Sequence, residues 1–349
     1  MRKIRIAQIG MNRYSHAPEI FTTMKLHPDV FDLVGYAVVE DERETCAGKI
    51  EKYYAGYEEL SIEEILNDPT IEAVTVETDE IHLLKYAQMA ADAGKHIHME
   101  KPGSQCLEDF EKLIDTMRQT GKVFHVGYMY RYNPLIADAI RRAKAGEFGH
   151  IYSVEAHMSR LDDRKAREWF GSFQGGMMFY LGCHLVDLVL QIQGLPKEVI
   201  PFNTATGIDE INTEDLGFAV LKYPHAVSVI RMGGTEVGGF NRRQLVICGS
   251  NETLEIRPLE ATLSEEQFGK KYMLTTKQRK CVLDKDGRCR TTEDDSIPFQ
   301  RYEDMLLSFA DMVRGEKENP YTLDYELELF KTILKCCGLK ITKDDRIER

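Results

Sequence analysis

The sequence lacks the features that would suit it to a membrane or to nucleic acid. Its 349 residues contain no apolar run near the roughly 20 residues that a membrane-spanning helix needs. Acidic side chains outnumber basic ones, 57 against 45, so the formal net charge is −12. No stripe of lysine and arginine with interleaved aromatic residues is present. We therefore expect neither a membrane nor nucleic acid as a partner.

Signals for export, for disulfides and for metal ligation are missing too. The opening MRKIRIAQIG has no signal-peptide pattern. The eight cysteines form no C-x-x-C pair, and the adjacent Cys336 and Cys337 cannot join in an ordinary disulfide. None of the ten histidines has a ligand-like spacing to cysteine or a carboxylate. The sequence therefore predicts a cytoplasmic protein with reduced thiols and no metal centre.

The first 127 residues alternate between short apolar strands and helices. Strands are predicted at 4–10, 33–39, 71–78, 96–99 and 123–127, and helices at 17–26, 61–67, 82–93 and 107–120. Ser61 and Glu64 have the spacing of a capping box, and Gly94 and Gly121 are helix stops. This alternation predicts an α/β domain with a doubly wound parallel sheet.

From residue 128 onward the pattern contains more strands. Helices are predicted at 135–145, 179–193, 302–314 and 323–337, a strand at 150–157, strands separated by turns over 199–259, and a loop with some strand at 264–298. The pattern predicts a second domain, of the α+β class, over 128–349. Its sheet is expected to be open and mainly antiparallel, with helices on one face.

Residues suited to binding follow five of the predicted strands: Gly10, Glu40, Thr78, Lys101 and Gly127. In a doubly wound sheet, ligands bind outside the carboxyl ends of the strands. Because these five positions share that edge, we expect a site there.

Lys101 lies between Glu100 and Pro102, directly after a predicted strand. The proline stops further strand pairing, so the ammonium is expected to be held in one place. A fixed positive charge can stabilise a negative charge that develops on a substrate oxygen. A plain surface turn is the alternative reading of this tripeptide alone.

The turn after the first strand keeps part of a dinucleotide-binding motif. The motif G-x-G-x-x-G lets a pyrophosphate approach the backbone at a helix N-terminus. Here the segment reads GMNRYSH and retains the first glycine, Gly10. Asn12 tolerates positive φ, Arg13 can add charge near a phosphate, and Ser15 can cap the helix. The turn remains compatible with a nucleotide.

Glu40 ends the second predicted strand, where an acid usually binds the ribose hydroxyls. A carboxylate there repels a 2′-phosphate, so NAD is the favoured cofactor. NADP is the second candidate because Arg43 is near in sequence. A solvated loop acid is the alternative reading of Glu40.

Four segments resemble a known family in order and spacing: MEKPGS at 99–104, IEAVTVET at 71–78 followed by His82, GYMYRYNP at 127–134, and GGMMFYLGCHLVDL at 175–188. Together they resemble the Gfo/Idh/MocA oxidoreductases over essentially the whole chain. The resemblance implies a dinucleotide-binding Rossmann domain at 1–127 and a substrate-binding and oligomerisation domain at 128–349. It also implies a homodimer or homotetramer formed through the second sheet, and oxidation of a sugar, polyol or related alcohol with NAD(P).

The resemblance also implies roles for single residues. Lys101 matches the lysine that holds the substrate hydroxyl and makes it more acidic, and His184 matches the general acid/base. Thr78 and His82 match positions beside the nicotinamide and its ribose, and Glu100 matches an acid that contacts the cofactor.

Arg131 and Asn133 fall where the family's segment borders the active site. Trp169 could stack on a sugar ring, and ordinary packing is the equal alternative. Asp187 could contact substrate or orient the histidine. We take Arg131, Trp169 and Asp187 as candidates for substrate contact.

Tyr180 departs from the family pattern, which has aspartate four residues before His184. On a regular helix the two side chains share a face. A phenol can relay a proton but cannot supply the charge of a carboxylate. We therefore predict that His184 is the base, that Lys101 polarises the oxygen, and that Tyr180 assists.

Two alternatives to a dehydrogenase stay open. One is a lyase- or glycosidase-like enzyme that retains NAD and oxidises a sugar carbon transiently, forming product without net nicotinamide reduction. The other is a non-catalytic nucleotide- or sugar-binding protein. The presence of both Lys101 and His184 counts against the second.

Overall fold

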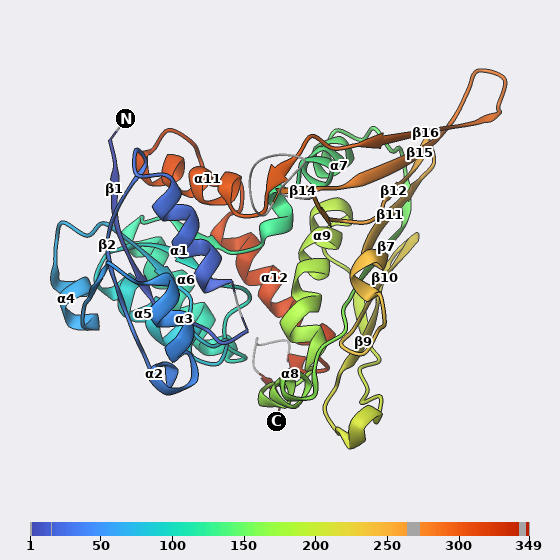
Figure 1. Ribbon diagram of the computed structural model, residues 1–349. Coiled ribbons are helices and arrows are strands. Elements are labelled where there is room, and N and C mark those ends of the chain that lie inside the picture. The colour runs from blue at the N-terminus through green and yellow to red at the C-terminus, as the bar shows by residue number, and fades with distance from the viewer. Residues whose placement is uncertain (1, 15, 264–272, 342–346, 349) are drawn as a thin grey trace. The chain divides into compact units, whose positions relative to one another are not determined.

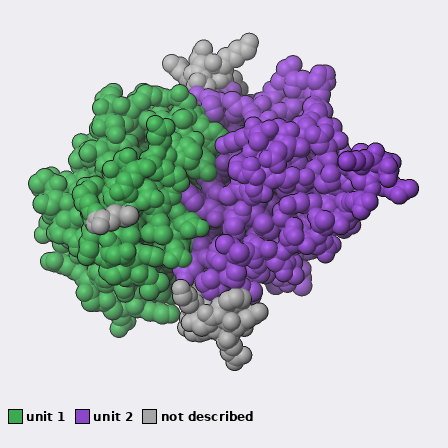
Figure 2. Space-filling model, turned by 90° about the horizontal axis from the view of Figure 1, so that it is seen from above, with its two compact units in different colours: residues 1–128, 302–327 green, residues 129–301, 328–349 purple. Residues whose placement is uncertain are grey.

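The computed structural model describes residues 2–14, 16–263, 273–341 and 347–348 (Figure 1). The chain forms two compact units, coloured separately in Figure 2. Unit 1 is Met1–Tyr128 with Tyr302–Leu327, and unit 2 is Met129–Arg301 with Glu328–Arg349. None of the described helices is both long and apolar enough to cross a membrane.

Unit 1 is built on a six-stranded sheet in the order β3-β2-β1-β4-β5-β6, and every neighbouring pair is parallel. The strands are β1 (Ile4–Ile9), β2 (Phe31–Ala37), β3 (Glu58–Glu59), β4 (Ala73–Val76), β5 (His96–Met99) and β6 (Phe124–Val126). All residues of β4 and β6 are buried, as expected when helices cover both faces of a parallel sheet. The predicted doubly wound sheet is confirmed.

The helices of unit 1 are α1 (Ala17–Leu26), α2 (Glu42–Thr45), α3 (Ala47–Tyr53), α4 (Ile62–Asn67), α5 (Leu83–Asp92), α6 (Leu107–Thr120) and α11 (Glu303–Arg314). The predicted capping box of α4 is confirmed, because Ser61 Oγ accepts from Glu64 N at 3.1 Å and Glu64 accepts from Ser61 N at 2.7 Å. Such a cap contributes about 1 kcal/mol. The short helices α2 and α3 were not predicted.

The segment Tyr302–Leu327 lies in unit 1, whereas the sequence placed everything after residue 127 in a second domain. Its helix α11 buries Phe309, whose ring stacks on His125 with 5.7 Å between centroids. Asn319 Nδ2 donates a hydrogen bond to the backbone O of Phe124, the first residue of β6, at 2.9 Å. The amphipathic pattern of α11 shows an apolar face but does not say which core receives it.

Unit 2 contains an eight-stranded sheet in the order β16-β15-β12-β11-β7-β10-β9-β8. The strands are β7 (Ile151–Ser159), β8 (Glu198–Pro201), β9 (Leu216–Tyr223), β10 (Ala226–Gly233), β11 (Gln244–Gly249), β12 (Glu252–Ile256), β15 (Lys277–Leu283) and β16 (Cys289–Asp295). The β7–β10 pair is parallel and the other pairs are antiparallel, which confirms a mainly antiparallel sheet. Burial alternates along β9 and β12, so one face is covered.

Smaller strands form two further sheets, β13 (Ala261–Thr262), β14 (Met273–Thr275) and β17 (Phe299–Gln300) in one, and β18 (Lys340–Ile341) with β19 (Ile347–Glu348) in the other. The sequence predicted a loop with some strand at 264–298, whereas residues 277–295 form the long β15–β16 hairpin (Figure 1). Every residue of β16 is exposed, so its sequence shows no apolar alternation. Residues 264–272 lie outside the described residues.

The helices of unit 2 include α7 (Pro134–Lys144), α8 (Arg164–Trp169) and α9 (Cys183–Gln193), and α12 (Leu323–Cys336) contains the boundary between the units. The helix predicted at 179–193 begins as a π-helix, Met178–Gly182, and becomes α-helical at Cys183. Gly176 precedes it with φ of +44°, and a Cβ there would lie 2.2 Å from Glu214 O. The close approach of the backbone therefore requires this glycine.

Candidate active site

The predicted binding residues of unit 1 follow strands whose last residues are in register. Pairing joins the strand ends in one row, Ile9, Val76, Met99 and Val126. Gly10, Thr78 and Lys101 come one or two residues later in the chain. The topology thus brings these positions to one edge of the sheet, as the sequence predicted.

Gly10 lies in a sharp turn where any residue with a Cβ would be strained. Its φ is +93°, and a Cβ would lie 2.7 Å from Thr78 N. Asn12, at the position of the second motif glycine, is fully buried. Its Nδ2 donates to Thr78 O at 3.2 Å and to Glu80 Oε2 at 3.0 Å, and its backbone N donates to Glu77 O at 2.9 Å. Side-chain hydrogen bonds therefore fix the turn where a glycine is missing.

Two cations lie at this turn. Arg13 is partly exposed, with Nη2 3.2 Å from Asp41 Oδ2 and 3.5 Å from Asp79 Oδ2. Lys49 Nζ donates to Arg13 O at 2.7 Å and to Asn12 O at 3.3 Å. Lys49 carries no motif signal in the sequence, so sequence reasoning missed it. Arg13 and Lys49 supply cationic groups that suit the pyrophosphate of a dinucleotide, and Asp41 and Asp79 offset part of their charge. Ser15 lies outside the described residues.

Glu40 lies three residues beyond β2, in a left-handed conformation with φ of +50°. Its Oε1 accepts from Lys85 Nζ at 2.6 Å and from Tyr86 Oη at 2.8 Å. These hydrogen bonds, the one from Lys85 above all, lower the pKa of Glu40 and keep it ionised. His82 Nδ1 is 3.9 Å from the same carboxylate. The structure thus brings together two predicted cofactor residues, and an ionised acid there suits the ribose hydroxyls of NAD.

Lys101 is 4% exposed and lies among buried carboxyl groups. Its Nζ is 3.7 Å from Glu80 Oε1 and 3.8 Å from Glu100 Oε1. Glu100 Oε1 also accepts from the backbone N of Lys101 at 2.9 Å. The structure therefore places the predicted Glu100 beside the lysine, and it adds Glu80, which sequence reasoning missed. Glu80 comes four residues after the buried strand β4, and only its nearness to that strand end could have indicated it.

The cluster continues to a second missed acid, Glu77. His98 Nε2 is 3.7 Å from Glu77 Oε1, and His98 Nδ1 is 2.8 Å from His125 Nδ1. Burial lowers the pKa of His98 to about 3, so this imidazole is neutral. Burial, reinforced by Glu100, raises the pKa of Glu77, and burial raises that of Glu80 to about 7 against the opposing charge of Lys101. Glu77 therefore favours its protonated form, and Glu80 changes its protonation state near neutral pH.

His184 is the second residue of α9 in unit 2 and is 2% exposed. The ring of Tyr130 meets it edge to face, with 5.3 Å between centroids. Tyr130 Oη donates to Glu260 at 2.9 Å and accepts from Arg243 Nη1 at 3.0 Å. Arg301 donates a further bond to Glu260 at 2.9 Å. This network of hydrogen bonds holds Tyr130 in place, and the ring of Tyr130 packs against the imidazole of His184.

Arg131 and Asp187, both predicted to contact substrate, bind each other in unit 2. Arg131 Nη2 donates to Asp187 Oδ1 at 2.8 Å and Nε donates to Oδ2 at 3.0 Å. Gln191 Nε2 also donates to Asp187, at 2.9 Å. Both ion-pair side chains are almost fully buried. Asn133 caps α7 by accepting from Leu135 N at 3.2 Å. These contacts anchor the start of α9 and of α7.

Tyr180 lies in the π-helix, one turn before His184. Its ring stacks on Phe170 at 5.4 Å and meets Trp169 edge to face at 5.2 Å, and the guanidinium of Arg160 lies 5.4 Å from its centroid. Tyr180 and His184, which were expected to share one helix face, contact different aromatic rings. The turn between them begins as a π-helix and not as a regular α-helix. Trp169 is partly exposed and also packs on aromatic neighbours. π-Turns are frequent at functional sites.

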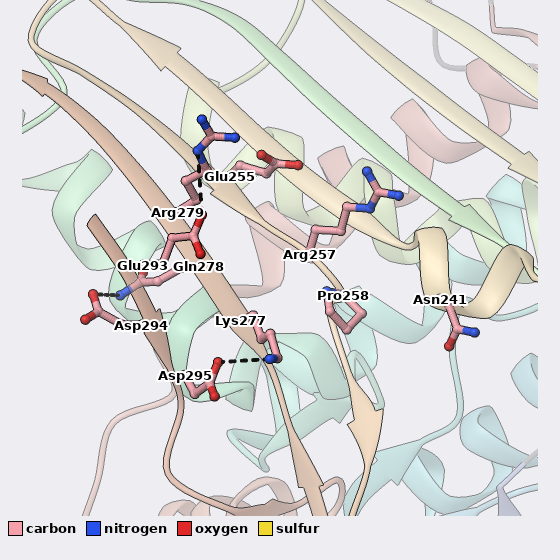
Figure 3. A pocket seen from close by; sticks show the side chains of 10 residues that line it. All are labelled: Asn241, Glu255, Arg257, Pro258, Lys277, Gln278, Arg279, Glu293, Asp294 and Asp295. Atoms are coloured by element: carbon pink, nitrogen blue, oxygen red, sulfur yellow. Dashed lines mark hydrogen bonds and ion pairs between the residues drawn. The ribbon is translucent and has the colours of Figure 1, made fainter. Parts of the chain in front are cut away.

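A separate hollow of about 490 Å³ lies on the charged face of β12, β15 and β16 (Figure 3). Its charges pair within the sheet, Lys277 with Asp295 at 3.6 Å and Arg279 with Glu293 at 4.0 Å. None of the predicted site residues lines it. No group of three or more histidine, cysteine or acidic side chains in the described residues is arranged to hold a metal ion.

Comparison with known proteins finds related dehydrogenases. A scyllo-inositol 2-dehydrogenase that uses NAD⁺, from Bacillus subtilis strain 168, is 32% identical over 158 residues, which cover 42% of each chain. An NADP⁺-dependent scyllo-inositol 2-dehydrogenase from the same organism is 23% identical over 66% of this chain and 64% of its own. The aligned part thus spans less than two thirds of either relative.

Among solved structures, aldose-aldose oxidoreductase from Caulobacter crescentus superposes with a TM-score of 0.75 at 18% identity, covering 100% of both chains. This likeness concerns the fold. Residues 4–128 match the oxidoreductase family with an NAD-binding Rossmann fold, and residues 136–255 match the GFO/IDH/MocA C-terminal domain. The chain therefore belongs to the Gfo/Idh/MocA family of oxidoreductases.

Proposed function

We propose that this protein is an NAD(P)-dependent dehydrogenase that oxidises a secondary alcohol of a sugar or polyol. One observation carries the proposal, namely the buried ammonium of Lys101 at the carboxyl edge of a parallel sheet. That edge is where doubly wound sheets bind nucleotides and substrates. The inositol dehydrogenases among its relatives support a sugar or polyol as the substrate class.

In the proposed reaction the substrate hydroxyl donates a hydrogen bond to His184 and accepts one from Lys101. As the C–H bond breaks, His184 takes the hydroxyl proton, and the ammonium of Lys101 stabilises the charge on the oxygen. A bound nicotinamide dinucleotide supplies the hydride acceptor. Tyr180, with Arg160 beside its ring, is proposed to hold a further hydroxyl or to pass on a proton.

The residues proposed to hold the dinucleotide all lie in unit 1. Gly10, Asn12 and Arg13 would contact the pyrophosphate at the turn after β1. Lys49 would stabilise that turn through its hydrogen bond to Arg13 O. The remaining proposed contacts, to the ribose and nicotinamide end, are Glu40, Thr78, His82 and Glu100. The ionised Glu40 favours NAD over NADP, because a 2′-phosphate would meet a carboxylate.

In unit 2, Trp169 is proposed to cover one face of the sugar ring, since part of its indole is exposed. Arg131 and Asp187 are proposed to act on substrate indirectly, by fixing the start of α9. A homodimer or homotetramer through the sheet of unit 2, in the cytoplasm, remains our prediction for the assembled enzyme.

Calorimetric titration with NAD and with NADP, followed by a screen of sugars and polyols, tests the function. We expect NAD to bind at least tenfold more tightly than NADP, a difference of about 1.4 kcal/mol. We also expect reduced nicotinamide to accumulate with at least one polyol. Product formation without nicotinamide reduction, or no binding of either dinucleotide, would refute the dehydrogenase.

A further inference from the structure

One carboxylate in unit 1 joins the turn after β1 to the proposed catalytic lysine. Glu80 Oε2 accepts from Asn12 Nδ2 at 3.0 Å, and Glu80 Oε1 lies 3.7 Å from Lys101 Nζ. Glu80 is fully buried, so water does not screen either contact. The backbone N of Asn12 donates to Glu77 O, which keeps the turn against the same segment.

The position of Glu80 is itself fixed from several sides. The Asn12 side chain also donates to Thr78 O at 3.2 Å, so the amide bridges two points of the segment that follows β4. On the side of β5, Glu100 approaches the same ammonium at 3.8 Å and accepts from the backbone N of Lys101. The lysine therefore has two carboxylate neighbours, and one of them is tied to the nucleotide turn.

We propose that Glu80 is a positioning residue, which holds the Lys101 ammonium in place with one oxygen and is itself held through the other by Asn12 of the nucleotide turn. The catalytic consequence rests on the proposed dehydrogenase, while the effect of Glu80 on the lysine does not. A nucleotide that engages the turn would then steady Glu80, and with it the lysine, before substrate binds.

The charged and titratable groups around Glu80 come from several elements. Lys101 and Glu100 at the end of β5 act on Glu80 directly, as does Glu77 on its own segment. Glu77 is in turn influenced by Glu19 on α1 and lies 3.7 Å from His98 of β5, and the adjacent Asp79 lies 3.5 Å from Arg13 of the turn. Among these, Lys101 is a cation within ion-pair distance of the Glu80 carboxylate. Replacing Glu80 should therefore change the proton affinity of that amine in particular.

The test measures the pH titration of Lys101 directly, in the whole protein without added nucleotide. Lysine labelled with ¹³C at Cε is incorporated, and the Lys101 signal is assigned by its loss in Lys101→Met. Its pH titration is then compared between the wild type and Glu80→Gln. We expect the midpoint to fall by about one pH unit, a tenfold loss of proton affinity, because a buried carboxylate neighbour is gone. Identical titrations would overturn the proposal.

Glu42→Gln is the matched control. Glu42 is also a buried acid of unit 1, and burial raises its pKa to about 7, but its carboxylate accepts from Val39 N at 3.0 Å. We expect this variant to leave the Lys101 midpoint unchanged. An equal shift in both variants would show a general effect of buried charge and would contradict a specific role for Glu80.

Asn12→Ala serves as a second variant, in case Glu80→Gln does not fold. It leaves the carboxylate present but removes its anchor, so we expect a smaller fall of the Lys101 midpoint and weaker NAD binding. If the Lys101 midpoint stayed at its wild-type value while NAD binding weakened, Asn12 would stabilise only the nucleotide turn. That result would overturn the link through Glu80.

Turnover gives an independent readout once a substrate is known. Glu80→Gln should lower kcat about tenfold and change KM less than about threefold, and Glu80→Asp should restore part of kcat, because a misplaced ammonium stabilises the transition state less. A wild-type protein without turnover would refute the proposed function, and the lysine titration would still decide the role of Glu80.

Discussion

Buried acidic side chains have different partners in the two units. In unit 1, Glu80 and Glu100 lie 3.7 and 3.8 Å from the ammonium of Lys101, and within the described residues neither oxygen of the nearby Glu77 has a hydrogen-bond partner. In unit 2, buried acids meet guanidinium groups with matched hydrogen bonds, as in the bidentate pair of Arg131 with Asp187.

We interpret the ion pair of unit 2 as stabilising the fold, and the acidic cluster of unit 1 as part of the reaction chemistry. A buried ion pair whose hydrogen bonds are satisfied fixes neighbouring groups, here the start of α9, which carries His184. Buried acids that outnumber their cation cost folding free energy, and groups with shifted pKa values cluster at functional sites. We infer that the ion pair of unit 2 stabilises helix α9, whereas the acidic cluster of unit 1 contains the groups that titrate.

The largest effect is expected at the centre of the unit 1 cluster. Lys101→Met removes the ammonium and should lower kcat by at least about a thousandfold, because the charge on the substrate oxygen loses its stabilisation. NAD affinity, measured by calorimetry, should change less than about threefold. Turnover near the wild-type rate would remove Lys101 from the mechanism.

Stability measurements should sharpen the contrast between the units. Arg131→Met leaves the Asp187 carboxylate buried without its cation and should cost about 3–5 kcal/mol in the free energy of unfolding. Glu77→Gln removes a carboxyl group that lacks a hydrogen-bond partner and should cost less than about 1 kcal/mol. Urea unfolding of both variants measures the difference. Equal losses would show that the two clusters are structurally alike.

The pH dependence of stability should also distinguish the clusters. The pKa of Glu80 is about 7 in the folded protein and 4.5 is its ordinary value, so the folded state holds the proton more tightly. The stabilisation is complete below the ordinary value and is lost as pH rises towards 7. Relative to Glu80→Gln, the wild type should lose on the order of 2 kcal/mol between about pH 4.5 and about pH 7.5.

Urea unfolding of the wild type and of Glu80→Gln at these two pH values measures that loss. A pH-independent difference between the wild type and Glu80→Gln would mean that Glu80 is ionised throughout this range.

The smallest effect is expected at Tyr180. Tyr180→Phe keeps the stacking on Phe170 and the edge contact with Trp169 but removes the hydroxyl. If the phenol passes on a proton or holds a substrate hydroxyl, kcat/KM should fall about tenfold, or about 1.4 kcal/mol. Unchanged kinetics would leave Tyr180 as a packing residue of the π-helix.

The sequence predicted most of unit 1 because its signals are local. The helix at 107–120 has an apolar stripe and a stopping glycine, and β5 lies where the alternating run ends before Pro102. The β15–β16 hairpin was missed because β16 has no apolar face. The place of α11 was missed because an amphipathic pattern does not identify its partner.

Parts of the site could also be predicted. Gly10 and Lys101 follow apolar strands at the expected edge, and Glu100 adjoins the lysine. Glu80 and Glu77 were missed because the contacts that matter join the ends of β4 and β5, which are distant in sequence. The π-turn before His184 was missed because i→i+5 hydrogen bonding depends on packing around Gly176, which the helical period does not show.

The most direct test of the account follows the hydride itself. A polyol found in the screen is deuterated at its carbinol carbons and incubated with the protein and NAD, and the nicotinamide is analysed by mass spectrometry. The account predicts one deuterium in the reduced nicotinamide for each alcohol oxidised, and none with Lys101→Met. Product formed while the nicotinamide stays oxidised and unlabelled would contradict it.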